Sequence, residues 1–298
     1  MNDMNIYRNI FAKKLKWKTR RFALPIAWVL VTGISACQKK DIDADALAEF
    51  EDSSTMPNLK YTDNGDLSIR YLEVTTASTA KPTVIFVHGA PGGSDNYYDY
   101  LKDPSFADSF NLITIDRLGY GGSGRGNAEP SIQKQAESLY PIINELLLDS
   151  QPIILVGRSY GGPIIAKIAM DRPDDIHGLL FLAPAIDPKH EKFEWAGKLG
   201  CSVPTKWITP KDMETAAVEK TNHAAELEKL LDQWKNIQAK VTYVHGDSDG
   251  IVPFENFAFA EEKLAHVIPN MVTMYGGNHF IPFQLQEKVK DWIRGLAK

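Results

Sequence analysis

Cysteine is scarce in this sequence, which has two in 298 residues, Cys37 and Cys201. A disulfide between them is possible, although Cys37 has a different explanation given below. The chain contains no C-x-x-C pair and no H-E-x-x-H motif, so its cysteines and histidines lack the spacing of zinc ligands. We therefore expect neither a metal nor a cofactor.

Positive charge is also scarce over most of the chain. Residues 37–298 carry 26 Lys and Arg against 37 Asp and Glu, a net charge of −11. Proteins that bind nucleic acids neutralise phosphates with basic side chains, so this acidic body argues against nucleic-acid binding. Apolar residues make up 44% of the chain, which is usual for a globular protein. We expect a small-molecule substrate.

The first 36 residues differ from the rest, because they hold seven Lys and Arg and one acid. An apolar run follows the basic stretch and covers residues 22–36. As a helix it would be about 22 Å long, which is short of the ~30 Å core of a membrane. A basic region, a short apolar run and small residues at its end predict a secretory signal peptide over residues 1–36.

The apolar run ends in Ile-Ser-Ala-Cys at residues 34–37, which resembles the lipobox of bacterial lipoproteins. The resemblance implies that Cys37 is lipidated and anchors the protein to a membrane of the bacterial cell envelope, facing the periplasm or the cell surface. An ordinary signal peptide with a chance cysteine is the alternative. Residues 37–58 are acidic and turn-rich, and we expect them to form a solvated tether.

The rest of the chain alternates between apolar runs and helical segments. Asn64-Gly65 between residues 59–63 and 67–75 predicts a hairpin. Six apolar runs have little polar alternation, as is typical of strands buried on both faces of a parallel sheet: 83–87, 111–115, 152–156, 178–182, 240–244 and 271–275. Helices are expected over 131–148, 161–171, 255–266 and 283–296.

This order predicts an α/β fold, a mostly parallel twisted sheet with helices on both faces. The core is expected over residues 59–186 and 237–298. Residues 187–236 have no convincing strand and include Trp195 and Trp207. We expect this segment to be a helical cap inserted after the sixth strand, with these two tryptophans as candidate substrate-binding residues.

A G-x-S-x-G motif covers residues 157–161, directly after a strand and before a helix. That setting predicts a sharp, strained turn that exposes the hydroxyl of Ser159 as a nucleophile, with flanking glycines that keep its surroundings clear. A serine hydroxyl needs a base. His279 is the candidate, because it follows the last strand, where open α/β sheets place ligands. His88 and His245 are expected to be structural, and His177, His190, His223 and His266 to lie on the surface.

The base needs a carboxylate to orient it. Asp249, after the strand at 240–244, fits best; Asp247 and Asp187 remain open as alternatives. Acyl transfer also needs donors for the developing oxyanion. The glycine-rich segment 88–93 lets the backbone turn tightly, and we assign the amides of Ala90 and Tyr160 to this role.

Together these motifs resemble the α/β-hydrolase superfamily over residues 59–298. The match comprises H-G-x-P-G-G at 88–93, D-R-x-G-Y-G-x-S at 116–123, the G-x-S-x-G motif, G-x-x-D-x-x-x-P at 246–253 and the late histidine. The order Ser, Asp, His along the chain is that of the fold. The resemblance implies a cap that shapes the substrate pocket, and a structural role for Asp116 in its turn.

Three functions are compatible with these residues. The first is a carboxylic-ester hydrolase that acts through Ser159, Asp249 and His279. The second is a proline-iminopeptidase-like enzyme, suggested by the segment 88–93; its substrate amine would need an acid such as Glu191 or Glu194. The third is a binding protein on a hydrolase scaffold. Arg158, beside the nucleophile, is either salt-bridged and structural or a cation of the pocket, and we favour the structural role.

Overall fold

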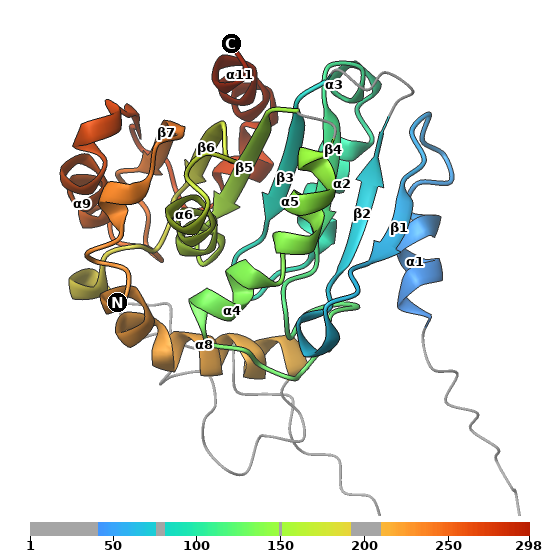
Figure 1. Cartoon of the computed structure of the whole chain (residues 1–298), viewed down its shortest axis with the longest axis horizontal. Coiled ribbons are helices and arrows are strands. Elements are labelled where there is room, and N and C mark those ends of the chain that lie inside the picture. Colours follow the sequence, from blue (N-terminus) through green and yellow to red (C-terminus); the bar gives the residue numbers. More distant parts are fainter. Residues whose placement is uncertain (1–40, 76–80, 149–150, 192–209) are drawn as a thin grey trace, which may run out of the picture. The chain divides into compact units, whose positions relative to one another are not determined.

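An eight-stranded sheet forms the centre of the computed structural model, which describes residues 41–75, 81–148, 151–191 and 210–298 (Figure 1). The strands lie in the order β1-β2-β4-β3-β5-β6-β7-β8. Their bounds are β1 Asn58–Tyr61, β2 Arg70–Val74, β3 Thr83–Val87, β4 Asn111–Ile115, β5 Ile153–Arg158, β6 Gly178–Leu182, β7 Lys240–Gly246 and β8 Asn270–Met274. All six predicted apolar runs are strands, with ends shifted by at most two residues.

Most of the sheet is parallel. Strands β3 to β8 pair in parallel, whereas β1 with β2 and β2 with β4 are antiparallel. The predicted hairpin is present, and its loop contains a short 3-10 helix, Gly65–Leu67. The fold therefore has the predicted mostly parallel sheet with an antiparallel edge.

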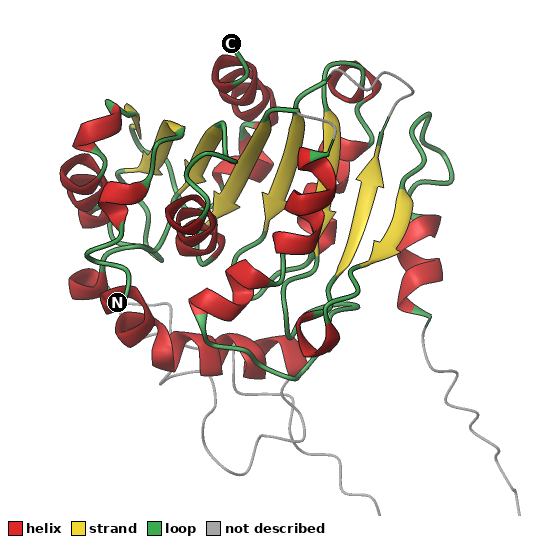
Figure 2. Ribbon diagram, in the orientation of Figure 1, coloured by secondary structure: helices red, strands yellow, loops and turns green. Residues whose placement is uncertain are grey.

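Helices cover both faces of the sheet (Figure 2). Along β3, Ile85 and Val87 pack into one buried apolar cluster, whereas Val84 and Phe86 pack into another. Both faces of the parallel strands are thus buried, which explains why their sequences show no polar alternation. The helices are α1 Ile42–Ala48, α2 Tyr98–Leu101, α3 Pro104–Ala107, α4 Ile132–Glu137, α5 Tyr140–Leu147, α6 Gly161–Asp171, α8 Lys211–Glu228, α9 Glu255–Lys263, α10 Ile281–Gln284 and α11 Gln286–Leu296.

The helix predicted over 131–148 is divided into α4 and α5. Ser131 caps α4, because its hydroxyl accepts a hydrogen bond from the amide of Lys134 at 3.3 Å. Pro141 lies in the first turn of α5. Proline has no N–H, and its ring clashes with the carbonyl four residues earlier, so a continuous helix is interrupted before it. The predicted C-terminal helix is likewise divided, into α10 and α11.

The expectation of a solvated tether is wrong for the segment from Ile42 to Phe50. This segment forms α1, whose N-cap Asp41 accepts hydrogen bonds from the helix amides. Ala46 and the fully buried Phe50 belong to the apolar cluster of one sheet face, and the Phe50 ring lies 4.9 Å from that of Tyr98. Ala46 and Phe50, two apolar residues in an otherwise acidic segment, therefore attach this segment to the domain.

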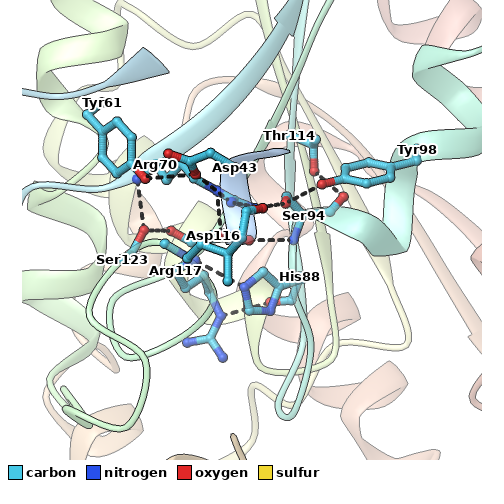
Figure 3. A network of polar contacts seen from close by, with 12 residues as sticks. Asp43, Tyr61, Arg70, His88, Ser94, Tyr98, Thr114, Asp116, Arg117 and Ser123 are labelled. Atoms are coloured by element: carbon cyan, nitrogen blue, oxygen red, sulfur yellow. Dashed lines mark hydrogen bonds and ion pairs between the residues drawn. The ribbon is translucent and has the colours of Figure 1, made fainter. Parts of the chain in front are cut away.

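A polar network joins α1 to the turn after β4 (Figure 3). Asp116 accepts hydrogen bonds from the amides of Ser94 and Gly122, both at 2.8 Å, and pairs with Arg70 at 2.9 Å. Arg70 also contacts Asp43 of α1 at 2.9 Å. Asp116 therefore has the structural role that was predicted for it.

The segment after β6 crosses the carboxyl ends of the strands as α8 (Figure 1). Its described part contains no strand, as expected, and it holds a helix of 18 residues. The predicted lipidation site Cys37 and the two tryptophans at 195 and 207 lie outside the described residues. None of the helices described is long and apolar enough to span a membrane.

Candidate active site

Ser159 lies in the turn between β5 and α6. Its φ is +52°, a left-handed conformation that is strained for a residue with a Cβ. The Ser159 amide donates to the Leu182 carbonyl at 3.1 Å. The Ser159 carbonyl accepts from the amides of Gly162 and Ala185, at 2.9 and 3.2 Å. These bonds hold the strained strand-turn-helix geometry of a nucleophile elbow, which the motif predicted.

Gly157 and Gly161, on either side of Ser159, are required for a steric reason that the sequence did not reveal. A Cβ at Gly157 would lie 2.6 Å from the carbonyl oxygen of Gly161. A Cβ at Gly161 would lie 2.3 Å from the carbonyl oxygen of Val87. Atoms cannot approach so closely, so both glycines are needed because α6 starts in contact with β3 and β5.

His279 and Asp249 meet across two loops, one after β8 and one after β7. His279 Nδ1 lies 2.7 Å from Asp249 Oδ2. Asp249 Oδ1 accepts hydrogen bonds from the amides of Ile251 and Val252, at 2.8 and 2.9 Å. The carboxylate is therefore held with one oxygen toward the imidazole. Nε2 of His279 makes no hydrogen bond within the described part of the chain.

Both groups have shifted pKa values. Burial would raise the pKa of Asp249, but hydrogen bonds from His245 and His279 lower it well below its usual range. Burial lowers the pKa of His279, and the charge of Asp249 offsets this only in part. Near neutral pH the carboxylate is thus ionised and the imidazole neutral, which is the form that can accept a proton.

The other two candidate acids have different partners. Asp247 is exposed and accepts a hydrogen bond from the Gly276 amide at 2.7 Å, as expected of a turn residue. Asp187 contacts His190 Nδ1 at 2.6 Å and caps the 3-10 helix that follows it. Of the three carboxylates that the sequence left open, Asp249 is therefore the one that contacts His279.

Three of the six remaining histidines are fully buried. His88 and His245 are fully buried and bond to the backbone, as expected: His88 Nδ1 lies 2.7 Å from the Gly89 carbonyl, and His245 Nε2 lies 3.2 Å from the Val252 carbonyl. His223 was expected on the surface, and this expectation is wrong. It is fully buried, and its ring stacks on that of Tyr160 at 4.5 Å because α8 lies against the nucleophile turn.

The amides of Ala90 and Tyr160 flank Ser159 from two different turns. Neither donates a hydrogen bond to a residue in the described ranges. Arg117 holds the first turn in place, because it donates to the carbonyls of His88 and Gly89 at 3.0 and 3.1 Å. Both amides therefore remain the candidate donors to an oxyanion.

Ser159, His279, Ala90 and Tyr160 all line one cavity of about 460 Å³. Four of the lining residues that sequence reasoning missed have polar or aromatic side chains that matter for the site: Lys220, His223, Phe280 and Phe283. Lys220 pairs with Glu191, whose other oxygen lies 3.2 Å from His223 Nδ1. Burial lowers the pKa of Lys220 to about 8. For these four residues, the sequence offered one sign of a place in the cavity, which is that Phe280 directly follows His279.

Arg158 lines the same cavity, and the structural role that we favoured for it is not supported. It is 8% exposed and forms no ion pair with a described carboxylate. Its guanidinium lies over the rings of Phe283 and Phe280, at 5.0 and 5.6 Å from their centroids. Of the two roles considered for Arg158, structural or cation of the pocket, the structure therefore favours the cation of the pocket. Within the described ranges, no group of three His, Cys, Asp or Glu side chains could hold a metal ion.

Comparison with known proteins agrees with this geometry. Residues 82–208 match a family model described as alpha/beta hydrolase fold. Among solved structures, Est816, an N-acyl homoserine lactone degrading enzyme, covers 79% of this chain and 99% of its own, with a TM-score of 0.55 and 19% identity. A bacterial membrane phospholipase A covers 86% and 89%, with a TM-score of 0.58 and 18% identity. The chain therefore has the α/β-hydrolase fold.

The curated relatives include a lipase, a peptidase and an acyltransferase. A monoacylglycerol lipase from Homo sapiens is 27% identical over 35% of this chain. A proline iminopeptidase from Lactobacillus helveticus is 27% identical over 37% of it. A 1-acylglycerol-3-phosphate O-acyltransferase from Arabidopsis thaliana is 31% identical over 39%. The matched segments cover 31%, 38% and 28% of these relatives' own lengths.

Proposed function

We propose that this protein is a serine hydrolase that cleaves a small-molecule carboxylic ester through an acyl-enzyme on Ser159. One observation carries the proposal: Ser159 and His279 line one cavity, and His279 is hydrogen-bonded to Asp249. A hydroxyl on a strained turn, a neutral imidazole and an ionised carboxylate are the groups that nucleophilic acyl transfer needs.

The proposed reaction has two steps. Neutral His279 takes the proton of Ser159 while Oγ attacks the ester carbon, and the amides of Ala90 and Tyr160 stabilise the oxyanion. The imidazolium then gives its proton to the leaving alcohol, and the acyl-enzyme remains. In the second step His279 takes a proton from water, the hydroxide attacks the acyl carbon, and the acid leaves as Ser159 recovers its proton. Asp249 keeps its charge throughout and stabilises the imidazolium.

Hydrolysis of p-nitrophenyl butyrate tests this mechanism. Ser159→Ala is expected to lower kcat by a factor on the order of 10⁶, because the nucleophile is lost. A fluorophosphonate probe should label the wild-type protein and not this variant. Ser109→Ala is the matched control, since Ser109 is exposed on the loop before β4, outside the cavity lining. Equal turnover by Ser159→Ala and wild type would refute the mechanism.

An aminopeptidase for N-terminal proline is the second candidate, supported by the Lactobacillus helveticus relative. Such an enzyme needs a carboxylate free to bind the substrate amine. Glu191 is in the cavity, but its charge is already compensated by Lys220. Glu194 lies outside the described residues. We therefore favour the ester, and comparing turnover of a prolyl arylamide with that of an ester separates the two activities.

A binding protein on a hydrolase scaffold is the third candidate. It predicts an inert serine, so a fluorophosphonate probe that leaves Ser159 unlabelled in the folded wild-type protein would favour it. The strain stored at Ser159 argues for chemistry instead, because such strain is typically retained at functional sites.

A further inference from the structure

Arg158 is a buried cation that has no hydrogen-bond or ion-pair partner among the described residues, and it directly precedes Ser159 in the sequence. It is the last residue of β5, and it is 8% exposed. Its Nε has no hydrogen-bond partner, and the side chain donates no hydrogen bond to any residue of the described ranges. Its exposed remainder belongs to the cavity wall that Ser159 and His279 also form.

Burying a guanidinium in this way is costly. A buried charge is normally paired with a carboxylate, because it has lost its hydration. Arg158 instead lies over two aromatic rings, which attract a cation but accept no conventional hydrogen bond. The five N–H groups of an arginine are arranged to hold a planar anion in a bidentate way. Within the described residues, the buried Nε–H of Arg158 therefore lacks an acceptor.

The neighbouring acids do not supply this acceptor. Asp249 attracts Arg158 from a distance, but its oxygens are used by His279 and by two backbone amides. Glu191 is paired with Lys220. Burial lowers the pKa of Arg158, and the phenol of Tyr97 and the charge of Asp249 compensate only in part. The side chain remains protonated at neutral pH, so the cavity wall carries a positive charge that no described carboxylate pairs with.

We propose that Arg158 binds an anionic group of the substrate, and that the enzyme prefers esters that carry a carboxylate close to the scissile bond. This inference rests on the proposed function and names its substrate class. The carboxylate fills the missing acceptor position and balances the charge, while the rings of Phe280 and Phe283 hold the guanidinium plane. It also accounts for a cavity that combines apolar walls with one unpaired cation.

Matched pairs of esters test the preference. Mono-p-nitrophenyl glutarate and its methyl ester differ in one negative charge on the acyl side. The butyrate ester of 4-hydroxybenzoate and that of methyl 4-hydroxybenzoate differ in the same way on the alcohol side. In at least one pair the wild-type protein should show kcat/KM at least about tenfold higher for the charged member, the size expected of a hydrogen-bonded charge. No preference in either pair overturns the proposal.

Variants of Arg158 assign the preference to this residue. Arg158→Gln is expected to lower the ratio of kcat/KM for the charged over the neutral ester about tenfold or more. Arg158→Lys should give an intermediate ratio, because lysine keeps the positive charge but cannot bind a carboxylate through two parallel N–H groups. Arg125→Gln is the control, because Arg125 is half exposed and pairs with Asp212 at 2.6 Å. It should keep the wild-type ratio. An unchanged ratio in Arg158→Gln overturns the assignment.

Binding of free glutarate gives a measurement independent of turnover. Glutarate is expected to slow fluorophosphonate labelling of the wild-type protein and to do so less in Arg158→Lys. If the probe does not label Ser159 and no ester is turned over, the proposed function itself fails. If neutral esters are hydrolysed in a Ser159-dependent way without any effect of charge, only the anion subsite fails.

Discussion

Two opposite charges act on the imidazole of His279. Asp249 is in direct contact and raises the pKa of His279, whereas burial and the charge of Arg158 lower it. Burial has the largest effect, so the net shift is downward from the usual value near 6.5. A base with such a pKa is deprotonated, and therefore active, over the whole neutral range.

The activity should accordingly depend on pH in one direction. We expect kcat/KM for p-nitrophenyl butyrate to be constant near pH 7 and to fall only below about pH 6.5, where His279 starts to gain a proton. Arg158→Gln removes a nearby positive charge, which favours the imidazolium, so the acid limb should move to higher pH. A pH-rate profile from 4.5 to 8.5 measures both. If the activity of the wild-type protein already began to fall above pH 7 as the pH is lowered, the lowered pKa of His279 would be contradicted.

Helix α8 is anchored to the catalytic core by a buried ion pair. Glu219 on this helix pairs with Arg117 at 2.6 Å, and both side chains are fully buried. Tyr120 donates to the same carboxylate at 2.7 Å. Since Arg117 also holds the carbonyls of His88 and Gly89, the pair connects α8 to the turn that carries the Ala90 amide.

Glu219→Gln is therefore expected to destabilise the protein. It leaves Arg117 buried without its counter-charge, which typically costs about 3–5 kcal/mol of the free energy of unfolding. Urea denaturation checks this value. Glu228→Gln, at the exposed end of the same helix, should change the free energy of unfolding by less than about 0.5 kcal/mol. Similar effects of the two substitutions would show that the buried pair has no special role.

At the scale of the whole molecule, we propose that Cys37 carries a lipid that anchors the enzyme to the bacterial envelope. Buried acyl chains contribute about 0.8 kcal/mol per CH₂ group to membrane binding. In a bacterial host, the protein is expected to incorporate radiolabelled palmitate and to sediment with membranes. Cys37→Ser should abolish both, and Cys201→Ser should abolish neither. Labelling that persists in Cys37→Ser would exclude this anchor.

The sheet and the nucleophile turn were predictable because their signals are local. Strands such as β3 are buried on both faces, so they appear in the sequence as continuous apolar runs. The turn at Ser159 needs glycine on either side, and this need is visible as a motif. Pro141 also signals the division between α4 and α5. The apolar periodicity on either side of it, however, predicts one continuous helix.

Other features could not be predicted, because they depend on contacts between distant segments. Phe50 is one aromatic residue among acids, and its contact with Tyr98 becomes visible only in the tertiary structure. His223 follows polar residues on α8, yet the helix turns it toward Tyr160. Lys220 neutralises Glu191 across the insertion.

The sequence by itself determined the order of the strands along the chain, the strained turn at Ser159 and the loops that carry the candidate acid and base, because backbone conformation depends on near neighbours. Only the tertiary structure decided that Asp249 contacts His279 and that no carboxylate in the described ranges pairs with Arg158. Charge pairing depends on which side chains converge in space, and several segments far apart in the chain contribute to that convergence.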